Sequence, residues 1–499
     1  MPPFLLGLDQ GTSGTKAYLM DLDGQRVGLG YAALPRLHPR PDWTEQDPMM
    51  VADGAARAIE LALADAHAQP SDILAAGIAS QRDSDFVWDS RTGQPIGNAI
   101  TWQDLRTAPL VTELDQWELA GERRHRLGYF PGPWCGALHL AWRMQNQPAF
   151  KTAMEGGYAR VGMAAGWLLA ALGTPAGHTH DLSLVQKTGL WDFRAGRYWS
   201  EWIERLGLTA TGLPGPAPTL HDYGVLHIGG ADVPVTAMLA DQQASLFGQG
   251  CRTAGQAKCT HGTMSFVNVV VEGDPPCLAS LNVYHAWSLS DATGAALRHT
   301  YCLEADTAAS GSAVRWLVNQ AGMLPGEADL DAIARSAADS GGVAFVPAFT
   351  GLNVPYNDHN ARAAILGMSL GAHRGHIARA LLEAIGYQLR AILETIGDET
   401  GITVAELNVD GGLSASDVAC QIQADLLGMP VHRSQEQEAT GRGAALLAGM
   451  GAGVWRSAED LPTLPAGGDR FEPTWSQDQR DAGYDRWQAA VKLVQMWHS

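Results

Sequence analysis

The chain has 499 residues, of which 46% are hydrophobic and 17% are charged, and its formal net charge at pH 7 is -19. This length exceeds what one hydrophobic core usually serves, so two or more domains are expected. The acidic balance repels nucleic acids and anionic membrane surfaces over long distances, which argues against both as partners.

Neither a signal peptide nor membrane insertion is expected. No basic region precedes the short apolar run at the N-terminus, and Asp9 interrupts that run. The longest weakly polar stretch, residues 161–173, is shorter than the roughly 20 residues that a membrane helix needs. We therefore expect a cytoplasmic protein, and the sequence leaves open whether it forms a homo-oligomer. The cysteines show neither a CxxC pair nor a zinc-like spacing and are expected to be reduced thiols: Cys135, Cys251, Cys259, Cys277, Cys302 and Cys420.

The first organised stretch is GLDQGTSGTK, residues 7–16. Its pattern predicts a strand that ends near Asp9, a tight glycine turn and a second strand. Such a turn lets backbone amides approach a phosphate, because glycine has no Cβ, and the neighbouring hydroxyl groups add donors. The carboxylate beside it suggests a hydrated Mg²⁺ ion. A glycine-rich hairpin with a solvated aspartate is the plainer alternative.

A polar loop over residues 41–47 precedes a predicted helix over 51–68 and a predicted strand over 73–79. This strand leads to Arg82 and Asp83, at the kind of sheet edge where α/β proteins hold ligands. Together the two side chains offer a donor and an acceptor for the hydroxyl groups of a sugar or polyol. A surface ion pair explains them equally well.

Two tryptophans follow in positions that suit the wall of a carbohydrate site. Trp102 lies in AITWQDLR, and Trp134 lies in a loop rich in proline and glycine. A place in a hydrophobic core explains Trp102 equally well, whereas the loop position of Trp134 favours contact with a ligand. Residues 156–173 read as a helix, and residues 178–186 read as a loop with strand character.

A predicted strand over residues 234–238 leads to Asp241, with Gln242 beside it, at the start of a helix. A carboxylate in this place can accept the proton of a hydroxyl nucleophile, while the adjacent amide orients the substrate. The competing explanation is that Asp241 caps the helix.

A domain boundary is expected near residue 250, because the next stretch repeats the first. Residues 256–271 predict strand, turn and strand again, with Gly262 and Thr263 in the places of Gly11 and Thr12. Two such hairpins indicate a duplicated domain that grips one phosphate group. The clearest helix, over residues 376–395, has an apolar stripe that we assign to the core.

A third site component is predicted in the second half. A turn of small residues at Gly311 starts a helix, and a strand over residues 406–409 leads to Gly411 and Gly412. Two glycines between a strand and a helix let a flat ring or a ribose approach the backbone, so this point suits an adenosine.

In this order the motifs resemble those of the FGGY carbohydrate kinases, and of the glycerol kinase-like members in particular. The resemblance runs from about residue 4 to residue 456. It rests on the motifs GLDQGTSGTK, SQRD with ITWQDLRT, ADQQASLFGQ, HGTMSFVN and VDGGLSASDVACQIQADLLGMPVHR.

The resemblance implies an α/β fold with two actin-like ATPase (ribonuclease H-like) domains flanking a central cleft. Residues 1–250 would form the N-terminal FGGY domain, with the acceptor site, and residues 251–499 would form the C-terminal one, with the adenosine site. It also implies transfer of the ATP γ-phosphate to a hydroxyl of a polyol or sugar.

The family's functional residues map onto this chain by position. Asp241 would be the general base, and Asp9 would organise Mg²⁺. The residues that would meet the phosphates are Gly11, Thr12, Ser13, Lys16, Gly262 and Thr263. Those that would line the ribose and adenine sites are Gly311, Gly411, Gly412 and Ser416. The acceptor would be held by Arg82, Asp83, Trp102, Trp134 and Gln242.

Some positions depart from glycerol kinases and keep other substrates open. Asp83 stands where those enzymes usually have Glu, Trp134 where they have Tyr, and Ser416 where the family often has Asn. A ketopentose kinase such as xylulokinase is the nearest alternative, although Arg82 and Asp83 replace the Met-His type segment that is usual there. An actin-like ATPase regulator without an acceptor is a more distant one.

Closure of the two halves around both substrates is predicted, since water in an open site would compete for the phosphoryl group. Small-angle scattering should therefore show compaction when nucleotide and acceptor are added together. An envelope that does not change would contradict this expectation.

Overall fold

The computed structural model describes residues 3–275, 278–290, 297–463 and 468–497, so Cys277 lies outside the described residues. The chain forms two compact units. The first contains residues 1–250, 284–301 and 438–464, and the second contains residues 251–283, 302–437 and 465–499. These units differ from a division into residues 1–250 and 251–499, because two later segments pack with the first unit.

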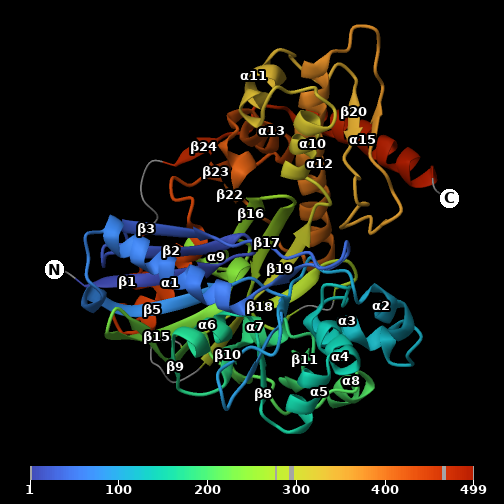
Figure 1. The fold of residues 1–499 in the computed structure, drawn as a ribbon. Coiled ribbons are helices and arrows are strands. Elements are labelled where there is room, and N and C mark those ends of the chain that lie inside the picture. The colour runs from blue at the N-terminus through green and yellow to red at the C-terminus, as the bar shows by residue number, and fades with distance from the viewer. Residues whose placement is uncertain (1–2, 276–277, 291–296, 464–467, 498–499) are drawn as a thin grey trace. The chain divides into compact units, whose positions relative to one another are not determined.

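The first unit is built on a seven-stranded mixed sheet in the order β3-β2-β1-β5-β15-β14-β9 (Figure 1). Strand β1 pairs antiparallel with β2 and parallel with β5, which pairs parallel with β15. The glycine turn predicted within residues 7–16 therefore joins the first two strands, as expected. The strands are β1 (Phe4–Gln10), β2 (Gly14–Met20), β3 (Arg26–Ala33), β5 (Ile73–Ser80), β9 (Gly173–Pro175), β14 (Leu220–Ile228) and β15 (Ala231–Ala240).

Helices cover both faces of this sheet, and alternation along β1 assigns its residues to them. Leu6 and Leu8 belong to the core formed with α1 (Pro48–Asp65), which lies over the sheet in Figure 1. Gly7 points the other way, because a Cβ there would lie 1.9 Å from the carbonyl oxygen of Gly441 in α14 (Ala439–Gly451).

The remaining elements of the first unit are shorter. Its other helices are α2 (Ala108–Leu114), α3 (Arg123–Leu127), α4 (Gly136–Asn146), α5 (Pro148–Glu155), α6 (Ala164–Leu172), α7 (Leu182–Gln186), α8 (Ser200–Arg205) and α9 (Asp241–Gly248). Small ladders pair β4 (Glu45–Gln46) with β7 (Ala99–Ile100), β6 (Phe86–Asp89) with β8 (Ala159–Gly162), β10 (Thr179–Asp181) with β13 (Gly215–Ala217), and β11 (Trp191–Asp192) with β12 (Arg197–Tyr198).

Three sequence predictions in this unit need correction. Residues 178–186, predicted as a loop with strand character, form β10 and then the helix α7. The helix predicted over 156–173 is wrong in its first part, where β8 pairs with β6 and the helix α6 begins only at Ala164. A short apolar run does not by itself distinguish a buried strand from a helix. The helix predicted over 51–68 begins earlier, at Pro48, because the Asp47 carboxylate accepts the amide of Met49 at 2.8 Å.

The second sheet has the order β18-β19-β17-β16-β22-β23-β24. As in the first sheet, a hairpin (β16 and β17) borders a parallel strand (β22), so the predicted internal repeat is present in the strand pairing. The strands are β16 (Ala257–His261), β17 (Ser265–Val271), β18 (Asn282–Ser290), β19 (Leu297–Asp306), β22 (Leu407–Asp410), β23 (Val431–Arg433) and β24 (Asp469–Phe471). A separate pair joins β20 (Ala344–Val346) to β21 (Ala364–Leu366).

The second unit has its own hydrophobic core around α12 (Arg374–Thr400). The apolar stripe predicted for this helix is buried: Ile377, Leu381, Ile385, Leu389, Ile392 and Ile396. Its other helices are α10 (Gly311–Asn319), α11 (Leu330–Arg335), α13 (Asp417–Leu427) and α15 (Gln477–Met496).

Two further expectations concern the chain as a whole. Among the residues that the structure describes, no helix is long and apolar enough to cross a membrane. The five described cysteines are buried, and Cys135, Cys251, Cys259 and Cys420 are free thiols.

Close backbone contact between α14 and its neighbours should make their glycines sensitive to substitution. A Cβ on Gly443 would lie 1.9 Å from the carbonyl oxygen of Ala244 in α9, whereas a Cβ on Gly54, within α1, would meet its nearest atom at 3.9 Å. We expect Gly443→Ala to destabilise the protein by at least about 2 kcal/mol through overpacking. The control Gly54→Ala should stabilise it by up to about 1 kcal/mol, because alanine is the better helix former. Equal melting temperatures for Gly443→Ala and Gly54→Ala in thermal denaturation would contradict this packing.

Candidate active site

Three of the predicted motifs start at one edge of the first sheet. The parallel register pairs Gln10 of β1 with Ser80 of β5, and Ser80 with Ala240 of β15. The glycine turn, the Arg82 and Asp83 segment, and Asp241 each follow directly after one of these residues. The register of three strands thus brings together side chains that are far apart in the sequence.

The glycine turn is tied to neighbouring segments. The Gly11 amide donates to the carbonyl of Gly14 at 3.0 Å, within the turn itself. The indole of Trp102 donates to the Thr12 hydroxyl at 2.9 Å, and the Gln46 amide donates to the Thr12 carbonyl at 2.9 Å. The Gly11 amide already donates a hydrogen bond within the turn. An anion would therefore have to be bound by the residues that follow Gly11.

Asp241 is the first residue of α9 rather than its cap, a position taken by Ala240. Its carboxylate accepts the amide of the adjacent Gln242 at 2.7 Å and lies 3.6 Å from the Nε atom of Arg82. The side chain remains 25% exposed. The geometry therefore does not match the helix-capping alternative, and the carboxylate can be reached by a ligand.

A second carboxylate lies close to Asp241. Burial, reinforced by the charge of Asp241, raises the pKa of Asp9 to about 7, although Lys16 acts in the opposite direction. Two carboxylates that repel each other in this way are suited to a divalent cation. In the described part of the chain no three His, Cys, Asp or Glu side chains converge on a metal site. The donors present therefore fit a largely hydrated Mg²⁺ ion better than a metal enclosed by protein ligands.

Lys16 has a partner that the sequence did not reveal. Its ammonium lies 2.5 Å from the Glu438 carboxylate, just before α14. Burial acts to lower the pKa of Lys16, but the hydrogen bond to Glu438 and its charge raise that pKa above its ordinary value. Glu438 lies more than 400 residues along the chain, so no local pattern could have indicated the pair.

The predicted acceptor residues contact a lysine that sequence reasoning also missed. The Lys187 ammonium, directly after α7, lies 2.8 Å from the Asp83 carboxylate and 4.6 Å from the ring centroid of Trp134. Lys187 is buried. A charged residue in the mostly uncharged stretch of residues 182–190 was the available signal.

The second unit contains a pocket of about 530 Å³ beside the second glycine turn. Four of the six residues predicted there line it: Gly262, Thr263, Gly412 and Ser416. Its other lining residues include Arg315 and Asp331. A volume in this range suits a small ligand or cofactor.

The two glycines at the end of β22 have different constraints. Gly411 has a φ of 83°, and a Cβ there would lie 2.4 Å from the carbonyl oxygen of His261. A Cβ on Gly412 would meet nothing within 4 Å, so this residue leaves open space in the pocket. Gly311 lies under the turn, since its amide donates to the Gly262 carbonyl at 3.1 Å.

Polar side chains of this pocket already have protein partners. The Ser416 hydroxyl caps α13 by accepting the Ala419 amide at 2.9 Å, and it donates to Asp331. Arg315 donates to the Thr263 hydroxyl at 3.2 Å. A helix cap explains Ser416 without any ligand, and Arg315 and Asp331 are pocket residues that the motifs did not identify.

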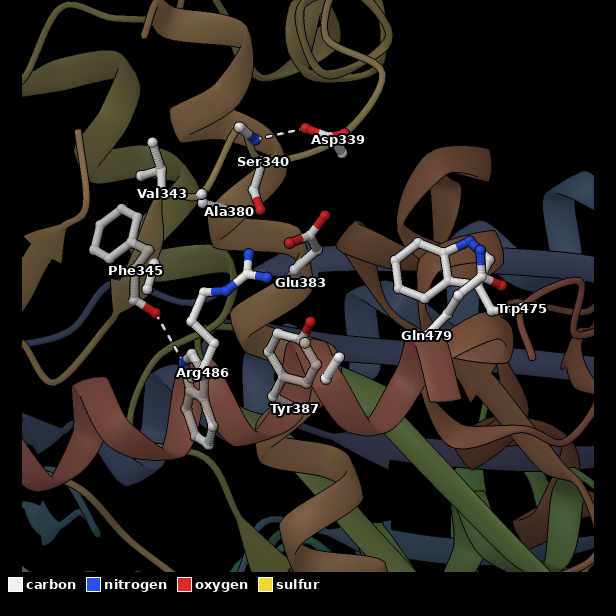
Figure 2. A pocket seen from close by; sticks show the side chains of 16 residues that line it. Asp339, Ser340, Val343, Phe345, Ala380, Glu383, Tyr387, Trp475, Gln479 and Arg486 are labelled. Carbon is white, nitrogen blue, oxygen red and sulfur yellow. Dashed lines mark hydrogen bonds between the residues drawn. The ribbon is translucent and has the colours of Figure 1, made fainter. Parts of the chain in front are cut away.

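Another pocket of the second unit, about 440 Å³, lies among α12, α15 and residues 339–345 (Figure 2). Figure 2 shows Glu383 and Tyr387 of α12 near Arg486 of α15, with Trp475 to one side. The Glu383 carboxylate lies 3.3 Å from Nε of Arg379. None of the predicted site residues lines this pocket.

Comparison with known proteins finds two matching sequence models. The N-terminal domain model of the FGGY family of carbohydrate kinases matches residues 4–248, and the C-terminal domain model matches residues 257–452.

Similar proteins cover nearly the whole chain. A glycerol kinase of Symbiobacterium thermophilum is 36% identical over 99% of both chains. Glycerol kinase 1 of Saccharolobus solfataricus is 34% identical over 99% of this chain and 97% of its own. The crystal structure of Plasmodium falciparum glycerol kinase with ADP is similar with a TM-score of 0.90 and 27% identity, covering 99% of this chain and 98% of that one. The xylulose kinase of Rhodospirillum rubrum is similar in fold, with a TM-score of 0.87, 23% identity and 99% of both chains covered.

Replacing Asp241 by Asn should change how stability depends on pH. Because the folded-state pKa of Asp9 is raised from 3.8 to about 7, the protein loses stability as pH rises through this interval and Asp9 ionises. Asp241→Asn removes one cause of that shift. The loss of stability should therefore be smaller, by about 1.4 kcal/mol for each unit by which the pKa of Asp9 falls.

Thermal melts at about pH 5 and about pH 8 measure this effect. The melting temperature of Asp241→Asn relative to the wild type should be higher at the upper pH, and this difference should vanish when Asp9→Asn is present in both proteins. A difference that is the same at both pH values would contradict the coupling of the two carboxylates.

Proposed function

Because the chain belongs to the FGGY family of carbohydrate kinases, we propose that it transfers the γ-phosphoryl group of ATP to a hydroxyl group of a small polyol or sugar. The proposal rests above all on one observation. The register of β1, β5 and β15 places Asp241 at the same sheet edge as the glycine turn and the Arg82 segment. A phosphoryl-transfer site needs these parts together: a base, a phosphate cradle and an acceptor site.

Asp241 is the general base in this mechanism. Its partly exposed carboxylate accepts the proton of the acceptor hydroxyl as that oxygen attacks the γ-phosphorus. Arg82, whose Nε lies 3.6 Å away, attracts the Asp241 carboxylate and helps to fix its direction. Gln242 follows Asp241 in the helix and is placed to orient the acceptor.

The acceptor is held by Arg82 and Asp83 against the rings of Trp102 and Trp134. The Arg82 guanidinium donates to the hydroxyl groups of the acceptor, and the Asp83 carboxylate accepts from them. The flat indole rings pack against the C–H faces of a polyol. The Trp102 indole also donates a hydrogen bond to the Thr12 hydroxyl at 2.9 Å. This bond links the acceptor site to the phosphate-binding turn.

ATP binds through the two glycine turns and the pocket of the second unit. Ser13, Lys16 and Thr263 meet the phosphates, together with the turns at Gly11, Thr12 and Gly262. The adenosine takes the pocket of about 530 Å³, next to Gly412 and Ser416 and supported by Gly311 and Gly411. The domains are assigned accordingly, with residues 1–250 carrying the acceptor site and base, and residues 251–499 carrying the adenosine site.

We assign Mg²⁺ to Asp9, whose ionised form is disfavoured by burial and by the charge of Asp241. When bound, the ion neutralises phosphate charge that builds up during transfer. Asp9 would hold this ion, and Lys16, paired with Glu438, adds a positive charge at the same turn.

Release of ADP measured with and without a panel of polyols and ketoses tests the proposal. Turnover that requires a small polyol supports it, and a preference for ketopentoses would favour the xylulokinase alternative. ATP hydrolysis that is indifferent to every acceptor would instead indicate an actin-like ATPase regulator.

Loss of the base should abolish turnover while sparing the nucleotide site. We expect Asp241→Asn to lower kcat by about 10² to 10⁴-fold, because the acceptor hydroxyl loses its proton acceptor. ATP affinity, measured by calorimetry, should stay close to that of the wild type. Asp23→Asn, at an exposed turn, is the matched control and should leave both quantities unchanged. Turnover of Asp241→Asn at the wild-type rate would exclude Asp241 as the base.

A further inference from the structure

Lys187 has an unusual environment for a lysine. Its side chain is only 3% exposed, and its ammonium lies 2.8 Å from the Asp83 carboxylate, which is 10% exposed. Taking a lysine out of water is unfavourable unless its charge is compensated. The position directly after α7 brings it to the segment that follows β5.

Three aromatic rings surround the same ammonium. The Lys187 Nζ atom lies 4.3 Å from the ring centroid of Tyr129, 4.6 Å from that of Trp134 and 4.5 Å from that of Tyr284. These distances are within the range of cation–π attraction. The rings thus hold the ammonium at one point, facing Asp83.

The backbone of Asp83 has an uncommon conformation. Its φ is 55°, in the left-handed region that residues other than glycine seldom adopt. A backbone conformation of this kind persists only where surrounding contacts fix it, and such residues cluster at ligand sites. The ion pair with Lys187 is a contact that fixes the carboxylate.

We propose that Lys187 is a positioning residue for the acceptor, which it serves by fixing the direction of the Asp83 carboxylate toward two neighbouring hydroxyl groups of an uncharged polyol or sugar. This inference rests on the proposed function of the site. Lys187 acts through Asp83 rather than by contact with the acceptor, because its side chain is almost fully buried. It matters for acceptor binding and not for the proton transfer at Asp241.

Steady-state kinetics of Lys187→Met tests this role. Methionine keeps the length and apolar stem of lysine but removes the charge. The KM for the acceptor should rise about tenfold or more, the loss expected when a hydrogen bond to a charged group is removed. The kcat and the KM for ATP should change by less than about threefold, because the proposed role of Lys187 is exerted through Asp83 and not on the base or the nucleotide. Lys151→Met, on an exposed lysine of α5, is the matched control and should leave all three unchanged.

Two further variants isolate the path through Asp83. Lys187→Arg keeps the charge and should retain more acceptor affinity than Lys187→Met. In the Asp83→Asn background, adding Lys187→Met should change the acceptor KM by less than about twofold, since the carboxylate that it positions is gone. The double variant removes both charges of the buried pair, so it can be compared directly with the wild type if either single variant folds poorly.

The outcomes are distinct from those that test the proposed function. A wild type that turns over no polyol or sugar rejects that function. A wild type that turns over, with the same acceptor KM in Lys187→Met, rejects the role of Lys187 alone. A loss of affinity confined to acceptors that carry a carboxylate would also overturn it, because Lys187 would then contact the acceptor directly.

Discussion

The parallel pairing of β1, β5 and β15 is the constraint on which the candidate active site depends. Hydrogen bonds between adjacent strands fix the register, so Gln10, Ser80 and Ala240 end at one edge of the sheet. A shift of register by one residue would turn every side chain to the opposite face. The backbone thus decides where Asp9, Arg82 and Asp241 lie, and the side chains only refine their geometry.

The second sheet uses the same arrangement. Strand β16 pairs parallel with β22, so that Thr260 lies beside Asp410 and the two glycine-rich segments follow together. The second turn and the pocket of about 530 Å³ therefore arise from the same rule as the first site. A repeated hairpin followed by a parallel strand gives one chain two places where backbone amides and glycines meet a ligand.

The first site concentrates charge that is unfavourable for the folded state. Burial, reinforced by the charge of Asp241, raises the pKa of Asp9 to about 7, and Lys187 is buried beside Asp83. Natural proteins keep such groups where function needs them, at a cost to stability. Arg82, Lys16 and Lys187 offset part of this cost by pairing with the carboxylates.

Local patterns predicted those parts of the fold that depend on local sequence. The glycine turns, the apolar stripe of α12 and the strand that ends before Asp241 were all recognised from residues close to one another. The α/β class, the FGGY family and a kinase acting on a small polyol or sugar are confirmed by the matching family models and relatives. The roles of the individual site residues stay predictions.

Contacts between distant segments could not be predicted in the same way. Glu438 pairs with Lys16 across most of the chain, and Lys187 pairs with Asp83 although the two residues are far apart in the sequence. The segment 438–464 joins the first unit because its glycines let α14 approach β1 and α9 closely. Residues 156–173 were misassigned for a related reason, since the partner strand β6 determines that β8 is extended.

A crystal structure with Mg²⁺, a non-hydrolysable ATP analogue and a polyol that the enzyme accepts would examine the role of Asp241 at atomic level. The reactive hydroxyl should lie about 2.6–3.2 Å from the Asp241 carboxylate, with a neighbouring hydroxyl bound to Asp83. A polyol bound in the first unit with every hydroxyl beyond hydrogen-bonding distance of Asp241 would contradict the proposed mechanism.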